Sequence, residues 1–284
     1  MKFSYKEAFS RNLGLLSENE QESLKKFTIS IAGMGAVGQA YIISLVRQGF
    51  EKFKIADFDK FELKNFNRQY GANLTSIGKE KTSVIKAIAL QINPNCKIEV
   101  LKDAINESNI NKFLSNSDLV LDGLDFFEIE ARRLLFSQSH QMRIPAITAG
   151  PIGFSTAFLI FMPRSPNFDR YTGIKNSMSY EEKLIRFAAG LAPKMLQRKY
   201  MKSVSFKGKK GPSSIAAVNL CAGVVTTNAL KILLGKGNVE AVPFFHQFDP
   251  MLNKYVKGKI LFGHRNPIHK LKIKIALKMM QSGR

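Results

Sequence analysis

The sequence is poor in two kinds of residue, cysteines and acids. Only two cysteines occur among 284 residues, Cys96 and Cys221. This number excludes a disulfide framework and a four-cysteine zinc site, so no zinc site is expected. Acidic residues number 22 against 43 Lys and Arg, which gives a formal net charge of +21 at pH 7. Such a charge favours a polyanionic partner: nucleic acid, an acidic protein, an anionic membrane surface or a nucleotide.

A hydrophobic leader is also missing. The first residues, MKFSYKEAFSRN, contain no apolar segment of the kind found in secretory signals. Two uncharged stretches, 144–163 and 212–230, have the length of a membrane span. The first is broken by Pro145, Gly150 and Pro151 and is expected to form two buried strands, and the second contains polar residues and is expected to form a buried helix. We therefore expect a cytoplasmic protein without a transmembrane segment.

The most informative stretch is 28–59, TISIAGMGAVGQAYIISLVRQGFEKFKIADFD. Its β-branched start predicts a strand that leads directly into a glycine-rich turn. An apolar segment of helical character follows and is expected to stop at Gly49, because glycine commonly ends helices. A second strand is predicted up to Asp57. The pattern is that of a βαβ nucleotide-binding unit.

Each glycine of the turn has its own use in such a unit. Gly33 permits the tight bend, Gly35 lets the backbone approach a phosphate, and Gly38 lets the helix pack close to the strand. The helix N-terminus then offers free N–H groups to an anion. Asp57, about 20 residues after the last glycine, can accept hydrogen bonds from ribose hydroxyls. The predicted nucleotide-binding residues of this stretch are Gly33, Gly35, Ala36, Gly38, Asp57 and Asp59.

Three features further along favour ATP with magnesium over a dinucleotide. Asn65 and Arg68 lie in the loop NFNRQ, and a guanidinium there offers a fork of donors that suits phosphate oxygens. Lys79 and Lys81 open the next predicted helix and add point charges. Asp125 follows a buried strand, where a carboxylate can hold a magnesium ion that bridges phosphates. The sequence therefore predicts a site for a triphosphate.

Strands and helices alternate along the first half of the chain. This alternation predicts an α/β fold with a Rossmann-like, doubly wound sheet that is parallel in its N-terminal half and mixed or antiparallel in its C-terminal half. Later strands are expected at 97–101, 118–122, 145–148, 154–161, 244–249 and 254–261, and later helices at 77–92, 107–114, 126–141 and 213–234. We expect a single domain over residues 1–284, made of a helical arm (1–27), a nucleotide-binding half (28–163), a crossover or lid (164–211), a C-terminal half (212–263) and a basic tail (264–284).

Basic residues without acids mark the end of the crossover and the tail. Residues 194–210 and 264–284 contain Lys and Arg but neither Asp nor Glu. In the tail, the cations alternate with Leu271, Ile273 and Ile275, which predicts an amphipathic helix. Such a helix suits an anionic surface or docks on its own protein with the charged face in water, and we favour the second interpretation.

This combination closely resembles the ThiF/MoeB/HesA adenylyltransferases, bacterial relatives of ubiquitin-activating enzymes. The resemblance runs from about residue 11 to 163 and again from 211 to 235. It is carried by RNLG from Arg11, GMGAVG from Gly33, ADFD at 56–59, NFNRQ at 65–69, IGKEK at 77–81 and LDGLD at 121–125. One departure is Phe126, where members of the family often have Asn after the catalytic Asp.

The resemblance implies particular roles for the matching residues. Asp57 would bind the ribose, Asn65, Arg68 and Lys81 the triphosphate, and Asp125 the magnesium ion. Arg11 matches an arginine that dimers of the family insert into the partner's site, which implies a homodimer with two composite sites. The implied catalytic residues are Arg68, Lys81, Asp125 and Arg11.

The implied reaction is ATP-dependent adenylation of a carboxylate with release of pyrophosphate. The acceptor would be the C-terminus of a small ubiquitin-like carrier protein or a small-molecule carboxylate. The alternative is a tRNA-modifying dehydratase of the same fold, which the charge of +21 favours. A non-catalytic nucleotide sensor and a nicotinamide dehydrogenase are further options. Cys221, within an apolar segment, is expected to pack in the core.

Overall fold

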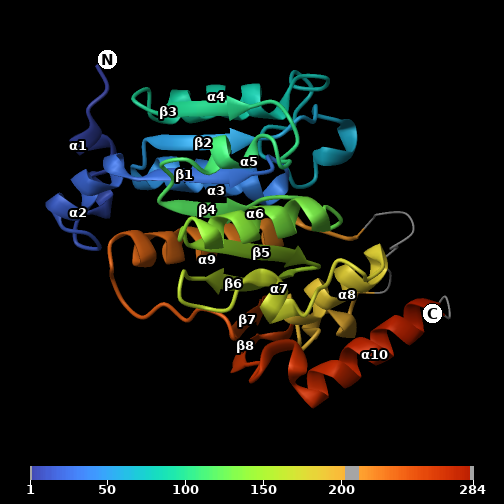
Figure 1. Ribbon diagram of the computed structural model, residues 1–284. Helices are drawn as coiled ribbons and strands as arrows, with labels where there is room; N and C mark the ends of the chain where they lie inside the picture. The colour runs from blue at the N-terminus through green and yellow to red at the C-terminus, as the bar shows by residue number, and fades with distance from the viewer. Residues whose placement is uncertain (1, 202–210, 282–284) are drawn as a thin grey trace. The chain divides into compact units, whose positions relative to one another are not determined.

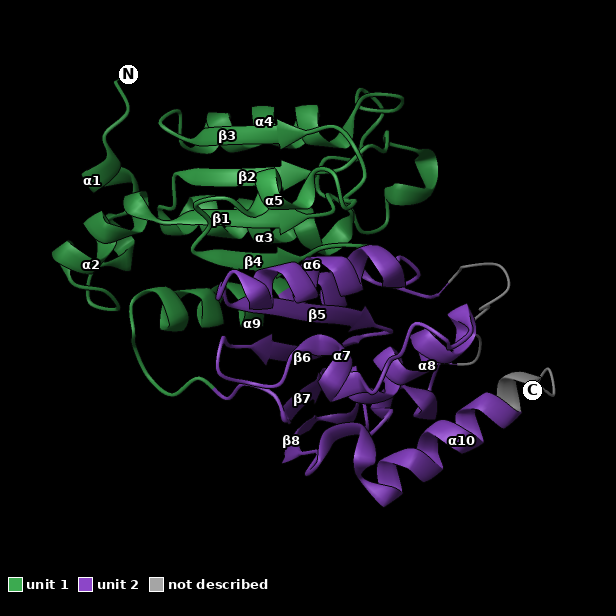
Figure 2. Ribbon diagram, in the orientation of Figure 1, with its two compact units in different colours: residues 1–124, 222–239 green, residues 125–221, 240–284 purple. Residues whose placement is uncertain are grey.

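The computed structural model describes residues 2–201 and 211–281 (Figure 1). The chain divides into two compact units (Figure 2). The first unit contains residues 1–124 and 222–239, and the second contains residues 125–221 and 240–284. The basic residues of 202–210, which belong to the predicted crossover, and residues 282–284 of the predicted tail lie outside the described part of the chain.

Four parallel strands form the centre of the first unit, in the order β3-β2-β1-β4. Strands β1 and β2 are buried along nearly their whole length, as expected for parallel strands covered on both faces. Their bounds are Thr28–Ala32 (β1), Lys52–Ala56 (β2), Lys97–Leu101 (β3) and Leu119–Asp122 (β4). All four agree closely with the strands predicted from the sequence.

Helices α3 (Ala36–Gln48) and α4 (Lys81–Ile92) pack beside each other on one face of these strands. Helix α3 ends where predicted, at Gly49, whose φ of 102° lies in the left-handed region that glycine adopts easily. Helix α5 (Ile110–Leu114) covers the opposite face (Figure 1). It starts three residues later than predicted because the asparagine side chains of Asn106 and Asn109 form a turn before it.

The N-terminal arm is tied to the far end of α3. It consists of α1 (Tyr5–Ala8), the short helix η1 (Ser10–Asn12), α2 (Glu18–Ser23) and η2 (Leu24–Lys26). Ser17 and Glu20 form the predicted capping box at the start of α2. Tyr5 donates a hydrogen bond to the carbonyl of Gly49 at 2.8 Å, and Asn12 donates to that of Gln48 at 3.1 Å. The arm therefore lies at the C-terminal end of α3.

Four antiparallel strands form the centre of the second unit, in the order β5-β6-β7-β8. They span Ala146–Ile152 (β5), Ser155–Phe161 (β6), Phe244–Asp249 (β7) and Lys254–Lys259 (β8). The predicted α/β class, parallel in the N-terminal half and antiparallel in the C-terminal half, is confirmed. Helix α6 (Ile129–Gln141) begins three residues later than predicted, because a turn at Asp125 precedes it.

The described part of the predicted crossover is largely helical. It contains α7 (Phe168–Thr172), α8 (Tyr180–Leu191) and the short helix η4 (Leu196–Lys199). Phe168, Leu184 and Phe187 are almost completely buried. The segment is therefore part of the core of the second unit. Its aromatic and aliphatic side chains recur at helical spacing, which places them on one side of the helices. Helix α10 (Pro267–Gln281) follows β8 and packs against α8.

Helix α9 (Ile215–Leu233) is, within the described ranges, the one helix long and apolar enough to cross a membrane. Ala217, Cys221, Val225 and Ala229 recur every four residues along it and are all fully buried. The prediction of a buried helix is thus confirmed for this face, including the packing role of Cys221. Its thiol lies 3.1 Å from the hydroxyl of Thr156.

Candidate functional site

The glycine turn lies between β1 and α3. It packs against Gly123, a contact that the sequence patterns did not predict. Gly33 has a φ of 90°, and a Cβ atom at this position would lie 2.4 Å from the carbonyl oxygen of Gly123. A Cβ atom on Gly38 would lie 1.9 Å from the carbonyl oxygen of Gly33. Three glycine backbones therefore touch here, which places the start of α3 directly beside the ends of β1 and β4.

This close packing gives the first prediction. Gly38→Ala should destabilise the protein by about 2–3 kcal/mol, since the added methyl group overlaps backbone that cannot rotate away. The same overlap should push α3 away from the turn and weaken binding of the predicted nucleotide, ATP. Urea unfolding and calorimetric titration with ATP measure the two effects.

A matched control exists in α9. A Cβ atom on Gly223 would meet no atom within 4 Å, so Gly223→Ala should stabilise the protein by about 0.5–1 kcal/mol through helix propensity. Equal stability of the Gly38 variant and the wild type would contradict the packing described for the turn.

Asp57 joins the turn to the end of β2. Its carboxylate accepts hydrogen bonds from the backbone N–H of Met34 at 2.6 Å and of Asp59 at 2.7 Å. Burial raises the pKa of Asp57, and the nearby charge of Lys81 opposes this shift. Each carboxylate oxygen retains a lone pair, so the group can still accept a ribose hydroxyl. The ribose role of Asp57 stays a prediction, and its hydrogen bonds to the turn add a structural role.

Lys81, at the start of α4, is paired with Asp59. Its Nζ lies 2.6 Å from Oδ2 of Asp59, and the backbone N–H of Lys81 donates to the Asp59 carbonyl at 3.0 Å. The Lys81 side chain is buried, whereas Asp59 is about half exposed. The structure thus brings together three residues that the sequence assigned to the nucleotide, Asp57, Asp59 and Lys81, at the carboxyl end of β2.

Asn65 and Arg68 lie in the loop that follows, at the short helix η3 (Leu63–Asn65). The side chain of Asn65 is buried and accepts a hydrogen bond from the backbone N–H of Glu62 at 2.9 Å, so it shapes the loop. Arg68 donates from Nη1 to the Lys64 carbonyl and to Oδ1 of Asn67, at 2.9 and 2.8 Å. A guanidinium has five N–H donors, so Arg68 keeps donors for phosphate oxygens while it is held in this position.

A buried amide pair connects this loop to the glycine turn. Gln39 donates from Nε2 to the Met34 carbonyl at 2.7 Å and to Oε1 of Gln69 at 3.0 Å. Its own Oε1 accepts from the backbone N–H of Gly71 at 2.9 Å. The sequence patterns did not predict this residue. A glutamine on the apolar face of a helix was the available signal, because a buried amide needs polar partners.

Asp125 opens the second unit and caps the turn before α6. Its Oδ1 accepts from the backbone N–H of Phe127 at 2.9 Å. The fully buried guanidinium of Arg132 donates to the carbonyls of Asp125 and Phe126, at 3.0 and 3.2 Å, and lies 4.6 Å from the centre of the Phe187 ring. The sequence did not predict this positioning role for Arg132.

Asp125 fits a magnesium ion only if the nucleotide supplies further ligands. Over residues 2–201 and 211–281, no three His, Cys, Asp or Glu side chains are grouped so that they could hold a metal ion. Magnesium commonly uses one or two carboxylates and completes its shell with phosphate oxygens and water. A single carboxylate with a free oxygen is therefore a suitable donor, and the role of Asp125 as a magnesium ligand stays a prediction.

Arg11 is exposed and lies far from the glycine turn of its own chain. The arm that carries it is bound to Gln48 and Gly49 at the C-terminal end of α3, whereas the turn lies at the N-terminal end. A helix of this length spans about 20 Å. Figure 1 shows the arm and the loop after β2 at opposite ends of the strands. Arg11 therefore cannot reach the glycine turn in the same chain.

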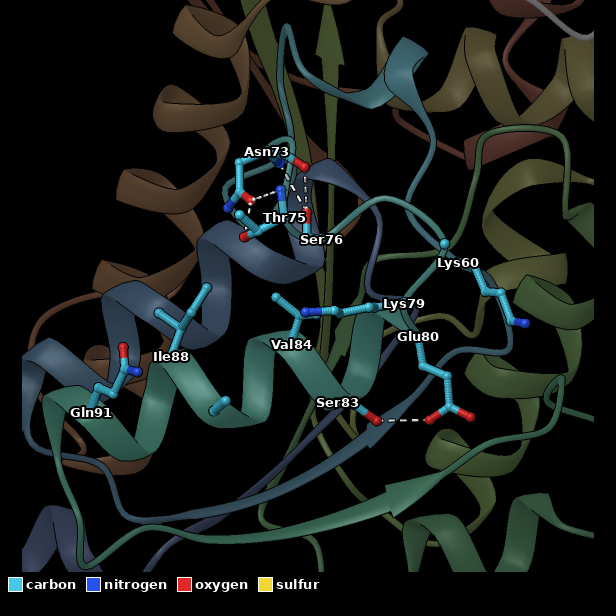
Figure 3. Close-up of a pocket in the computed structure, with 12 residues that line it drawn as sticks. Lys60, Asn73, Thr75, Ser76, Lys79, Glu80, Ser83, Val84, Ile88 and Gln91 are labelled. Carbon is cyan, nitrogen blue, oxygen red and sulfur yellow. Dashed lines mark hydrogen bonds between the residues drawn. The ribbon is translucent and has the colours of Figure 1, made fainter.

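A hollow of about 620 Å³ lies on the outer side of α4. It is lined by the loop around Asn73 and by one side of the helix, including Val84 and Ile88, with Lys79 extended over Val84 (Figure 3). Ser83 donates to Glu80 at its edge, at 2.7 Å. Lys79 lines it, but the glycine turn, Asp57 and Lys81 do not, so the hollow is not where the predicted nucleotide-binding residues gather.

The first unit defines a class of protein: a Rossmann-like α/β fold with a glycine turn at the start of its first crossover helix and an acid at the end of the second strand. The model of the ThiF family matches residues 9–267, and the chain belongs to this family.

Relatives include tRNA threonylcarbamoyladenosine dehydratases and molybdopterin-synthase adenylyltransferases. The chain is 33% identical over 118 residues to the tRNA threonylcarbamoyladenosine dehydratase of Bacillus subtilis, an alignment that covers 41% of this chain and 46% of that protein. It is 29% identical over 150 residues to the molybdopterin-synthase adenylyltransferase of Haemophilus influenzae, covering 52% and 61%, respectively. The chain thus spans about half the length of the curated relatives it matches.

Solved structures resemble the chain over most of its length. PaaA matches with a TM-score of 0.70 and 20% identity, covering 92% of this chain and 84% of PaaA. E. coli MccB with ATP matches with a TM-score of 0.67 and 19% identity, covering 89% and 70%, respectively. At this level of identity the likeness concerns the fold.

Proposed function

We propose that the protein binds ATP at the glycine turn and adenylates a carboxylate, with release of pyrophosphate. The observation that carries this proposal is the cluster of Asp57, Asp59 and Lys81 beside the turn in a chain of the ThiF family. Asp57 would accept the ribose hydroxyls, while Lys81 and Arg68 would hold the phosphates. The magnesium ion at Asp125 would neutralise charge on the departing pyrophosphate.

The reaction needs no general base. A carboxylate has a pKa of about 3.5 to 4, so its oxygen is already charged at neutral pH. That oxygen attacks the α-phosphorus, a bond to the acyl oxygen forms, and the bond to the pyrophosphate oxygen breaks. Positive groups held in place lower the barrier because charge grows on the leaving group. Asp59 is about half exposed, so its carboxylate could move away from Lys81. Lys81 would then bind a phosphate oxygen instead.

We propose a homodimer in which Arg11 completes the site of the partner. Arg11 cannot reach its own glycine turn, as described above. The loop that carries the predicted phosphate ligands also exposes an unusual number of large apolar side chains. These are Phe58, Leu63, Phe66, Tyr70, Leu74 and Ile77. An apolar patch of this kind suits a protein interface.

Two acceptors are compatible with the family. The first is a carboxylate at the C-terminus of a ubiquitin-like carrier or on a small molecule, as the likeness to molybdopterin-synthase adenylyltransferase suggests. The second is a carboxylate on tRNA, which the net charge of +21 and the likeness to the tRNA dehydratases favour. Either activity would take place in the cytoplasm.

ATP–pyrophosphate exchange tests the proposal. Radiolabelled pyrophosphate should enter ATP when the purified protein, magnesium and the correct carboxylate are combined. Candidate ubiquitin-like carriers form one arm of the experiment, and tRNA with threonylcarbamoyladenosine forms the other. Binding of tRNA should weaken steeply as salt rises, whereas binding of a carrier should be blocked by its free C-terminal peptide. Absence of ATP binding in calorimetry would overturn the proposal.

A further inference from the structure

Helix α10 has two apolar faces, and only one of them is covered. The inner face packs Ile273, Ala276 and Leu277 against Ile185 and Ala189 of α8. The helix is also held at its start, where Nδ1 of His264 lies 2.9 Å from the Arg170 carbonyl, and at its middle, where Lys272 donates to the Pro193 carbonyl at 2.9 Å. Its orientation on the second unit is therefore fixed by contacts.

The outer face carries a second apolar stripe. Ile268, Leu271 and Ile275 are spaced as on one side of a helix, and they are 67, 58 and 50% exposed. Phe262, in the turn before the helix, is 82% exposed. It has a φ of 63°, a left-handed conformation that is uncommon for a residue other than glycine. A helix with a purely solvated outer face would carry polar residues at these positions.

A row of lysines lies beside this stripe. Lys270, Lys274 and Lys278 follow one another every four residues and are exposed. Among the described residues, no carboxylate forms an ion pair with any of the three, and the sequence contains neither Asp nor Glu after Asp249. The lysine row therefore keeps its charge toward the outside.

The buried side of α10 carries a histidine that adds no charge. His269 is almost fully buried there, and burial close to Lys272 and Arg186 lowers its pKa to about 4. It is therefore neutral at neutral pH. The exposed apolar stripe and the lysine row thus lie on the outward sides of the helix, whereas Lys272 is held by the Pro193 carbonyl.

From this arrangement we infer that α10 is a binding surface for an anionic lipid bilayer, on which it lies parallel to the plane of the membrane. The stripe of Ile268, Leu271 and Ile275, together with Phe262, enters the boundary between headgroups and acyl chains. Lys270, Lys274 and Lys278 lie at the level of the acidic headgroups. The buried inner face keeps the helix attached to the second unit, so binding of the helix would bring the second unit to the surface.

A lipid surface accounts for both halves of the pattern. Apolar side chains contribute to binding in proportion to the area they bury, and each lysine adds electrostatic attraction to acidic headgroups. A nucleic acid would use the lysines but leaves the isoleucines and Leu271 in water. The proposal is independent of the adenylation proposed above, because none of these residues belongs to the nucleotide site.

Vesicle binding tests the inference with the full chain. The protein should sediment with vesicles that contain one quarter phosphatidylglycerol and much less with pure phosphatidylcholine. Replacing Lys270, Lys274 and Lys278 by Gln should lower the partition coefficient on the order of 100-fold. Replacing Leu271 and Ile275 by Gln should lower it by a similar factor. The control variant has Gln at the exposed Lys97, Lys112 and Lys175. Its net charge equals that of the variant with Gln at Lys270, Lys274 and Lys278, but it should bind vesicles nearly as well as the wild type.

The absence of tryptophan provides a second measurement. Ile275→Trp should shift its fluorescence to the blue when acidic vesicles are added, and Leu74→Trp, in a loop of the first unit, should not. Circular dichroism should show that all variants are folded, since every substituted side chain is exposed. Failure to bind acidic vesicles, equal binding by the Leu271/Ile275 variant, or retention by RNA but not by vesicles would each overturn the inference.

Discussion

Asp125→Asn should lower the rate of ATP–pyrophosphate exchange on the order of 100- to 1000-fold, the usual effect of removing one group that stabilises charge in a transition state. The substitution removes the charge but retains an oxygen that can accept the hydrogen bond from the N–H of Phe127. The turn before α6 should therefore survive. Exchange assays at saturating acceptor measure the rate, and thermal unfolding measures the fold.

The control for this prediction is Asp103→Asn. Asp103 is exposed in the loop after β3, so its substitution should leave the exchange rate within about twofold of the wild type. The midpoint of thermal unfolding should be the same for both variants. Exchange at the full rate in the Asp125 variant would show that Asp125 has no role in the reaction. It would not bear on the roles predicted for the other residues of the site.

Arg11→Ala should reduce the rate of ATP–pyrophosphate exchange by a similar factor. A partner chain with an intact Arg11 should restore activity. Mixing this variant with Asp125→Asn should restore about a quarter of the wild-type rate. In each mixed dimer, one site combines an intact Asp125 with an intact Arg11, while the other site lacks both. Random pairing makes about half of all dimers mixed, and each of these has one working site.

The same mixture separates action in trans from action in cis. If Arg11 served its own chain, neither partner in the mixture would have a complete site, and the rate would stay at the level of the single variants. The mixed population is best obtained by co-expression with two affinity tags. Arg47→Ala is a suitable control, because Arg47 is an exposed cation near the same end of α3 and should not change the rate.

Local signals predicted the first unit well. Each of these signals lies within a few residues of the structure that it predicts. They are the glycines of the turn, the acid at the end of β2 and the capping box at Ser17. Contacts between distant segments were not predictable in this way. Gly123 touches Gly33 from another strand, and the Gln39 amide bonds to Gln69 in a loop.

Segment 164–211 shows what composition alone leaves out. Its many charges predicted a crossover or lid, and they gave no sign that Phe168 and Phe187 are buried in the second unit. Two of the charged side chains between them are paired with distant residues: Asp169 accepts hydrogen bonds of 3.0 and 2.8 Å from Arg133, and Lys183 binds Glu130 at 2.6 Å. Such pairs allow charged helices to cover a core, and their partners are far apart in the sequence.

Both thiols of the chain are out of reach of a reactive intermediate. Cys96 and Cys221 are buried, and burial raises the pKa of each to about 12, so neither is a thiolate at neutral pH. If the protein forms the mixed anhydride proposed above, neither of these sulfurs would take up its acyl group as a covalent carrier. The proposal then implies that the acyl group is taken up by a nucleophile that another molecule delivers.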